Sequence, residues 1–455
     1  MTPDTSAAPV PASVAAAAPL PAAVPGAYAP PSPWRWIPTL YFAQGLPFVV
    51  VMTLSVVMYK NLGISNTEIA LYTSWLYLPW VVKPLWSPLV ELLGSKRRWI
   101  VALQFVVGAA LAMVALTVPA RDFFRTTLAV FWLLAFASAT HDIAADGFYM
   151  LGLPPHHQAA FVGVRSTFYR LAMVAGQGGL VYLAGRLQEH SGDVRLAWSL
   201  VFGMLACLFL LAALLHGWVL PRPLMDRPAA PGSHFRRDFI AVFAAFFSKP
   251  GILRILAFLL LYRFAEAQAL KLVVPFLLDS RAAGGLGLST QDVGIASGTL
   301  GIAALTAGGL LGGWVISRWG LGRLLWPLVI GMHLPNLVFV ALALVQPQSL
   351  WTIGGGIALE QFFYGFGFAA YMVAMLMVAS QGRDGLENEH KTAHYAICTG
   401  FMALGMMLPG MAAGWLQEQL GYPRFFFWVC AATVPSFIAV ALMRVDPDFG
   451  KPATG

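Results

Sequence analysis

Long apolar stretches alternate with short polar ones over most of this chain. From Trp36 onward, each apolar stretch approaches the ~20 residues that a helix needs to cross about 30 Å of hydrocarbon. These stretches lack the alternation of barrel strands, and unpaired backbone groups are costly in lipid, so helices are predicted. Twelve helices are expected, at residues 36–58, 68–92, 99–118, 126–148, 161–185, 196–218, 252–279, 290–316, 324–345, 350–377, 392–416 and 425–443.

Two segments depart from this pattern. The first 33 residues are rich in Ala and Pro, which predicts a disordered tail rather than a signal peptide. A long polar break after the sixth helix predicts a cytoplasmic linker between two bundles. The expected divisions are a tail at 1–33, a six-helix bundle at 34–218, a linker at 219–250, a second six-helix bundle at 251–443 and a tail at 444–455.

Composition supports a protein that is solvated mostly by lipid. Of the 455 residues, 58% are hydrophobic and only 11% are charged, whereas a soluble domain carries about 25% charged residues. A soluble fold, a disordered chain and a coiled coil are therefore excluded. The net charge of +8 does not indicate nucleic-acid binding, because no basic patch with interleaved aromatics lies on a water-soluble module. The three cysteines lie in apolar runs, so neither a disulfide framework nor a metal or other cofactor is expected.

The basic residues predict the orientation of the chain. If the amino terminus is inside, most Lys and Arg residues outside the helices fall in cytoplasmic segments. Both termini of this multi-pass membrane protein are therefore expected in the cytoplasm.

The two halves of the chain repeat one another. Residues 42–44 (Phe-Ala-Gln) correspond to residues 264–266 (Phe-Ala-Glu), which lie 222 positions later. Residues 62–65 (Leu-Gly-Ile-Ser) correspond to residues 286–289 (Leu-Gly-Leu-Ser), which lie 224 positions later. Matches in the same order indicate a parallel duplication, which is typical of one large transporter architecture.

Two loops, at residues 88–98 and 312–323, resemble the loop signature of the major facilitator superfamily, in which an acid precedes glycine and a basic cluster. The resemblance implies a latch between bundles at the cytoplasmic face. Ser317 replaces the acid in the second loop, so the latch is expected mainly in the first half. The alternative is a set of ordinary topogenic charges. The candidate latch residues are Glu91, Arg97, Arg98 and Arg318.

The fourth helix carries two acids in an apolar run. Asp142 and Asp146 are four residues apart and therefore share one helix face. Charges at membrane depth are expensive and usually face a cavity or a partner. A network with Lys83, Arg165 and Arg170 is expected, because these residues lie at compatible depths. The network could serve proton coupling or gating, or it could be a permanent structural cluster.

Together with the two acids after His141, three segments resemble the muropeptide permease (AmpG-like) family. They are residues 168–173 (Phe-Tyr-Arg-Leu-Ala-Met), 392–396 (Thr-Ala-His-Tyr-Ala) and 414–416 (Gly-Trp-Leu). The resemblance covers residues 36–443, and acetyl-CoA transporters and siderophore importers share the same frame. It implies a proton-driven importer of a bulky polar solute, located in a bacterial inner membrane.

In this superfamily the first helix of each three-helix repeat lines a central cavity. The resemblance therefore implies lining residues on the first, fourth, seventh and tenth helices. The seventh helix also carries Lys271 as a charge within an apolar run. The alternative for Arg263 and Glu266 is that they neutralise each other and never touch substrate. The candidate substrate and proton-coupling residues are Tyr41, Gln44, His141, Asp142, Asp146, Arg170, Arg263, Glu266, Glu360 and Tyr364.

These observations predict an all-α membrane protein with twelve helices in two pseudo-symmetric bundles. The expected function is proton-coupled import of a muropeptide or small oligosaccharide by alternating access. Siderophore or acyl-CoA transport is the alternative within the same frame, and a transporter-like sensor or membrane-embedded enzyme is the alternative class. No enzyme is expected, because the sequence offers no nucleophile cluster and no phosphate-binding loop. The expected partners are a small-molecule substrate, protons and the bilayer, with no nucleic acid and no obligate protein partner.

Overall fold

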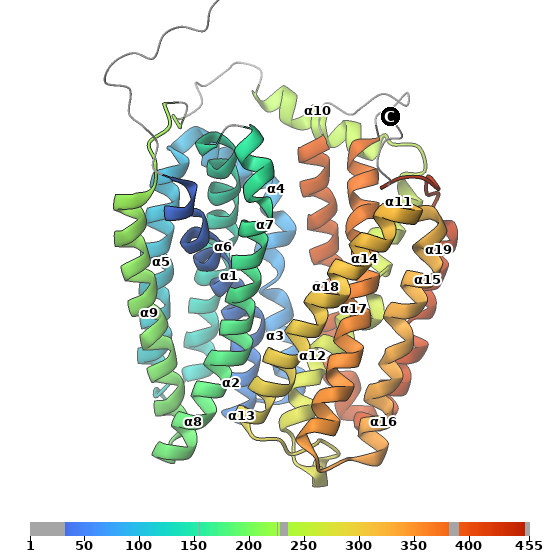
Figure 1. The fold of residues 1–455 in the computed structure, drawn as a ribbon. Helices are drawn as coiled ribbons and strands as arrows, with labels where there is room; N and C mark the ends of the chain where they lie inside the picture. The colour runs from blue at the N-terminus through green and yellow to red at the C-terminus, as the bar shows by residue number, and fades with distance from the viewer. Residues whose placement is uncertain (1–31, 154, 225, 228–234, 382–390, 451–455) are drawn as a thin grey trace, which may run out of the picture.

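The computed structural model describes residues 32–153, 155–224, 226–227, 235–381 and 391–450. All the secondary-structure elements within these residues are helices, and they are joined by turns and short loops. Two groups of helices stand side by side (Figure 1), and they divide the chain into an N half and a C half. Of the predicted disordered tail, residues 1–31 lie outside the described residues, and its last residue, Pro33, begins η1.

The N half is built from long helices, some of which are divided by short π-helical segments or turns. Its elements are η1 (Pro33–Arg35), α1 (Ile37–Val49), η2 (Val50–Leu54), α2 (Ser55–Asn61), α3 (Asn66–Trp75), α4 (Leu78–Leu93), α5 (Lys96–Thr117), α6 (Phe123–Gly152), α7 (Pro155–Val174), η3 (Ala175–Leu180), α8 (Val181–Ser191) and α9 (Val194–Val219).

The C half repeats this arrangement after an additional helix, α10. Its elements are α10 (Phe235–Phe247), α11 (Ile252–Leu261), α12 (Phe264–Leu278), η4 (Arg281–Ala283), α13 (Thr290–Val293), η5 (Gly294–Gly301), α14 (Ile302–Trp319), α15 (Leu321–His333), η6 (Leu334–Asn336), α16 (Leu337–Val345), α17 (Leu350–Ser380), α18 (Lys391–Ala431) and α19 (Val434–Leu442).

Each of the twelve predicted segments falls on one helix or on a run of consecutive helices. Eight helices in the described part of the chain are long and apolar enough to cross a membrane, or nine if the bent pair Phe239–Phe247 and Ile252–Leu278 is one span. The eighth, Lys391–Leu442, contains two predicted segments, because the backbone leaves helical geometry at Gly421 (φ 71°, ψ 163°). The result is an all-α, multi-pass membrane protein.

The repeated segments have a common structural role at the start of α3 and α13. Gly63 and Gly287 adopt positive φ angles of 82° and 64°, which glycine tolerates without steric cost. The serines that follow, Ser65 and Ser289, each accept a hydrogen bond from the backbone N–H three residues later. The duplicated Leu-Gly-x-Ser sequence is therefore a helix-start signal that both halves retain.

The predicted linker, residues 219–250, contains an unexpected helix. Although the segment is polar overall, α10 presents an apolar face and packs on α18 of the C half. Phe246 is fully buried and stacks on Phe401 at 6.3 Å, and His394 Nε2 lies 3.1 Å from the Val242 carbonyl oxygen. The predicted linker therefore contains a helix, α10, that packs on the C half and lies across one end of the molecule (Figure 1).

Candidate functional site

The two ends of the molecule differ in how the halves meet. We call the end with α10 and the marked C-terminus the tail end, and the end with α8, α13 and α16 the far end (Figure 1). A polar cluster joins the halves at the far end. Lys60 Nζ lies 2.6 Å from Asp279 Oδ1, and the Asn66 amide donates to Gln417 at 2.7 Å and to Tyr422 at 3.0 Å. The Tyr422 hydroxyl donates to Asp279 Oδ2 at 2.5 Å.

Glycines also allow close contact between the halves. Gly294 and Gly298 on η5 lie against the region of η3, and a Cβ at Gly298 would collide with the backbone of Gln177 and Gly178. A Cβ at Gly294 would lie 2.8 Å from the Tyr182 nitrogen. The N half and C half therefore touch backbone to backbone here.

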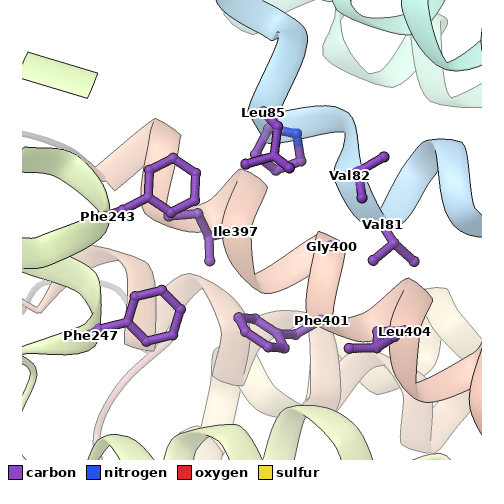
Figure 2. Close-up of a pocket in the computed structure, with 10 residues that line it drawn as sticks. Val81, Val82, Leu85, Phe243, Phe247, Ile397, Gly400, Phe401 and Leu404 are labelled. Carbon is purple, nitrogen blue, oxygen red and sulfur yellow. The ribbon is translucent and has the colours of Figure 1, made fainter. Parts of the chain in front are cut away.

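At the tail end an apolar pocket lies between the halves. It has a volume of about 140 Å³ and is bordered by α4, α10 and α18. Figure 2 shows Phe243 and Phe247 of α10 on one side of it and Val81 and Val82 of α4 on the other. The far end is thus held by direct polar bonds. At the tail end the pocket lies beside a close contact between α4 and α18, where a Cβ at Gly400 would lie 2.8 Å from the Val81 carbonyl oxygen.

The expected charged network of the N half is divided into two ion pairs. Asp142 accepts a hydrogen bond from the Trp80 indole at 3.1 Å and lies 4.0 Å from Lys83 Nζ. Asp146 instead pairs with Arg165 at 3.0 Å.

Two further predicted residues lie beside these pairs, and a third does not join them. Gln44 faces the Asp142 carboxylate. The Arg165 guanidinium lies 4.7 Å from the centre of the buried Tyr41 ring. Arg170 forms no ion pair with any described residue, so the structure does not bring it into either pair.

His141 faces the interior of the N half rather than the Asp142 group. Its Nε2 lies 3.1 Å from the Gln104 amide nitrogen, and the Gln104 oxygen lies 2.9 Å from His216 Nδ1. His216 Nε2 in turn lies 3.0 Å from the Thr39 hydroxyl. This buried network links four helices, and its members other than His141 escaped the sequence analysis because single polar residues in apolar runs carry no spacing signal.

The predicted residues of the C half have separate partners. Arg263 donates to the Tyr364 hydroxyl and lies 4.8 Å from the Phe368 ring centre. Glu266 Oε1 lies 3.3 Å from His333 Nδ1, and both side chains are 2% exposed. Local neutralisation of Arg263 by Glu266 does not occur within ion-pair distance in this structure. His333 was not predicted, because it lies near the end of a different helix, α15.

Glu360 is also buried in the C half. It is 3% exposed and accepts a hydrogen bond from Gln361 at 2.9 Å. Glu266 acts on it electrostatically, which places the two carboxylates near each other.

Lys271 lies where α12 meets the N half. Its Nζ donates to the Thr73 hydroxyl at 2.9 Å and lies 5.2 Å from the Tyr77 ring centre. The side chain is 5% exposed and has no carboxylate within ion-pair distance among the described residues. A buried ammonium thus lies between the halves, held by a hydroxyl and an aromatic face.

The described contacts of the candidate latch residues include no bond between the halves. Arg97 donates to the Gly217 and Leu220 carbonyl oxygens at the end of α9, within its own half. Arg98 and Arg318 are exposed and form no ion pair within the described residues. The Glu91 side chain lies outside the described part of the chain.

Two bundles of membrane-spanning helices, joined at one end and carrying buried ionisable side chains between and within them, define a membrane transporter. The family model of the Major Facilitator Superfamily matches residues 39–385, and the chain belongs to this superfamily.

Curated relatives point to one branch of it. The chain is 26% identical to the anhydromuropeptide permease of Escherichia coli (strain K12) over 424 residues, which covers 90% of this chain and 80% of the relative. It is 25% identical to a putative transporter, AmpG 4, of Rickettsia conorii, with 89% and 95% covered. These relatives confirm the resemblance that the sequence motifs indicated.

Solved structures share the fold. A D-xylose-proton symporter superposes with a TM-score of 0.67 at 12% identity, covering 91% of this chain and 98% of the symporter. A nucleoside transporter superposes with a TM-score of 0.64 at 16% identity, covering 90% and 98%.

Proposed function

We propose that this transporter imports an anionic muropeptide into the bacterial cytoplasm, driven by protons. Transport follows from the superfamily, and the muropeptide class comes from the curated relatives named as permeases of such compounds. The charge of the substrate is inferred from the residues themselves.

The observation that carries the proposal is the pair of cations on and beside α12. Arg263 is 9% exposed and Lys271 is 5% exposed, yet neither has a carboxylate within ion-pair distance among the described residues. Burying an uncompensated charge costs several kcal/mol, so such cations usually serve a binding partner. The carboxylates of a muropeptide peptide stem would supply that partner, whereas a neutral oligosaccharide would not.

Orientation and conformation agree with import. The predominance of basic residues supports a cytoplasmic location for the tail end, and the far end would then face the periplasm. The polar cluster around Asp279 closes the far end. A joined far end is the arrangement expected of an importer after it has received substrate from outside.

Proton coupling is supported by carboxylates placed within apolar helices, among them Asp142, Glu266 and Glu360. One proton that enters with a singly charged anion makes the transported pair electrically neutral, so the pH gradient supplies the drive: about 1.4 kcal/mol, or roughly tenfold accumulation, per pH unit.

The test is uptake of a labelled anhydromuropeptide into proteoliposomes that contain the purified protein. We expect accumulation above the external concentration, loss of that accumulation when a protonophore is added, and weak competition by a neutral disaccharide. Accumulation that survives the protonophore would contradict proton coupling. Equal competition by the neutral disaccharide would contradict anion recognition. Competition by a ferric siderophore alone would instead indicate a siderophore transporter.

A further inference from the structure

A carboxylate and an imidazole lie together in the interior of the C half. Glu266 on α12 and His333 at the end of α15 are each 2% exposed, with 3.3 Å between Oε1 and Nδ1. In the described structure, neither oxygen of Glu266 and neither ring nitrogen of His333 has a hydrogen-bond partner. Buried polar groups almost always have a hydrogen-bond partner. The carboxylate oxygens and ring nitrogens at this contact therefore remain able to bind a proton or form a hydrogen bond.

The corresponding interior of the N half is different. Its third membrane helix, α5, carries Gln104, and the third membrane helix of the C half, α15, carries His333, 229 positions later. The Gln104 side chain is hydrogen-bonded to both His141 and His216, and no carboxylate takes part in this network. The position of Glu266 is occupied by the amide Gln44 in the first repeat. At these related positions, the C half pairs a carboxylate with an imidazole, whereas the N half has two amides.

The groups that surround this pair come from α17, the end of α11, α19 and the start of α12. Glu360 and Tyr364 on α17 and Tyr262 after α11 lie within electrostatic range of Glu266. On α19, the Phe437 ring packs edge-on against the His333 imidazole at 5.4 Å. The nearest cation along α12 is Arg263, one helical turn away, which is bonded to Tyr364. The pair is therefore surrounded by one acid, two phenols and an aromatic ring, and no Lys or Arg of the described residues lies within ion-pair distance of Glu266.

We propose that Glu266 and His333 together form the proton-carrying site of this transporter, and this inference rests on the proposed proton-coupled function. The ionised carboxylate with a neutral imidazole has a charge of −1, and binding of one proton makes the pair neutral. Shared between an oxygen and a nitrogen 3.3 Å apart, the proton is held in a site that is closed to solvent in this conformation. It is taken up when the far end is open and returned when the tail end is open.

The position of Arg263 explains how the proton is linked to substrate. When Glu266 is ionised, its negative charge one turn away attracts the guanidinium. When Glu266 is protonated, that attraction disappears and Arg263 is free to bind a substrate carboxylate. Proton binding and substrate binding therefore strengthen each other, as thermodynamic linkage requires.

The experiment separates coupling from binding. Glu266→Gln and His333→Gln variants are reconstituted, and two activities are measured with labelled anhydromuropeptide. The first is accumulation driven by an inward gradient of one pH unit at zero membrane potential, which supports about tenfold accumulation for one proton. The second is exchange of labelled for unlabelled substrate across the membrane, which needs no net proton movement.

We expect both variants to lose accumulation, so that the ratio falls to one, while each retains exchange. His216→Gln is the matched control, because His216 is a buried histidine in the neutral network of the N half, and it should retain accumulation.

Three results would overturn the inference or its basis. Accumulation retained by the Glu266→Gln and His333→Gln variants would exclude this pair as the proton site. Loss of exchange together with accumulation would assign both residues to substrate binding or folding instead. A wild-type protein that shows no gradient-driven accumulation would contradict the proposed function itself, whatever the variants do.

Discussion

Two acidic side chains that look equivalent in the sequence occupy different surroundings in the structure. Asp142 and Glu266 both interrupt apolar helices, which is why each could be predicted as a functional candidate. Asp142 lies near Lys83 and accepts from Trp80, and its side chain is 15% exposed. Glu266 contacts only His333 at ion-pair distance and is 2% exposed. The sequence identifies costly charges, but their partners come from distant helices and depend on packing.

Lys271 provides a direct test of anion recognition. Replacement by Gln removes the positive charge but keeps a group that can donate to Thr73. Hydrogen bonds to charged groups contribute about 1.5–3 kcal/mol, so we expect a roughly ten- to hundredfold rise in KM for anhydromuropeptide uptake. The Lys271→Arg variant, which keeps the charge, should recover part of the affinity. An unchanged KM in Lys271→Gln would show that this ammonium does not meet the substrate.

Gln104 is expected to matter for stability rather than for transport chemistry. Gln104→Leu leaves His141 and His216 with unsatisfied nitrogens in a buried site. Each unsatisfied group costs about 1–3 kcal/mol, so the purified variant should unfold at a lower temperature, while its KM for substrate stays the same. Thermal unfolding in detergent and uptake kinetics check the two statements separately. A large change in KM without loss of stability would place this network at the substrate site.

At the level of the elements, helix positions follow from the sequence better than helix interruptions do. The apolar stretches and the repeated serine caps locate the helices, because hydrocarbon thickness and backbone pairing leave few alternatives. The break before α12, at Arg263, could not be anticipated from local composition. The helix α10 was also missed, because its apolar face is stabilised by packing against Phe401 and His394 of a remote helix.

The contact between η3 and η5 depends on Gly298. A Gly298→Val substitution would place side-chain atoms onto the backbone of Gln177 and Gly178, so the halves could not approach as closely. We expect the variant to separate at the far end and to lose transport. Spin labels at the exposed residues Ser191 and Ala283, one on each half, should report a longer distance by electron resonance. The same substitution at Gly313, where a Cβ meets nothing within 4 Å, is the control and should leave the distance unchanged.

At the scale of the whole molecule, Asp279 helps to set the balance between the two ends. Asp279→Asn weakens the bond to Lys60 and the acceptor for Tyr422, and the bond to Lys60 joins the two halves at the far end. Interactions of this kind shift conformational equilibria by about 1–3 kcal/mol, so the population open at the far end should rise roughly 5- to 150-fold. Labels at Leu93 and Lys391 should then report a shorter distance at the tail end.

The control for this variant is Asp292→Asn. Asp292 is an acid in the same end of the C half, but it caps α13 within its own half. It should leave the label distances as they are in the wild type. If Asp279→Asn and Asp292→Asn behave alike, the cluster around Asp279 is not a determinant of closure.

The different interiors of the two halves have a consequence for how this chain could evolve. Duplication provided two equivalent halves. The N half keeps a hydrogen-bonded interior around Gln104, and one such half is sufficient to maintain the fold. The other copy can then accept costly residues such as Glu266 and His333 without loss of the architecture. Substitutions in the C half can therefore change the substrate or the driving ion, while the N half maintains the fold.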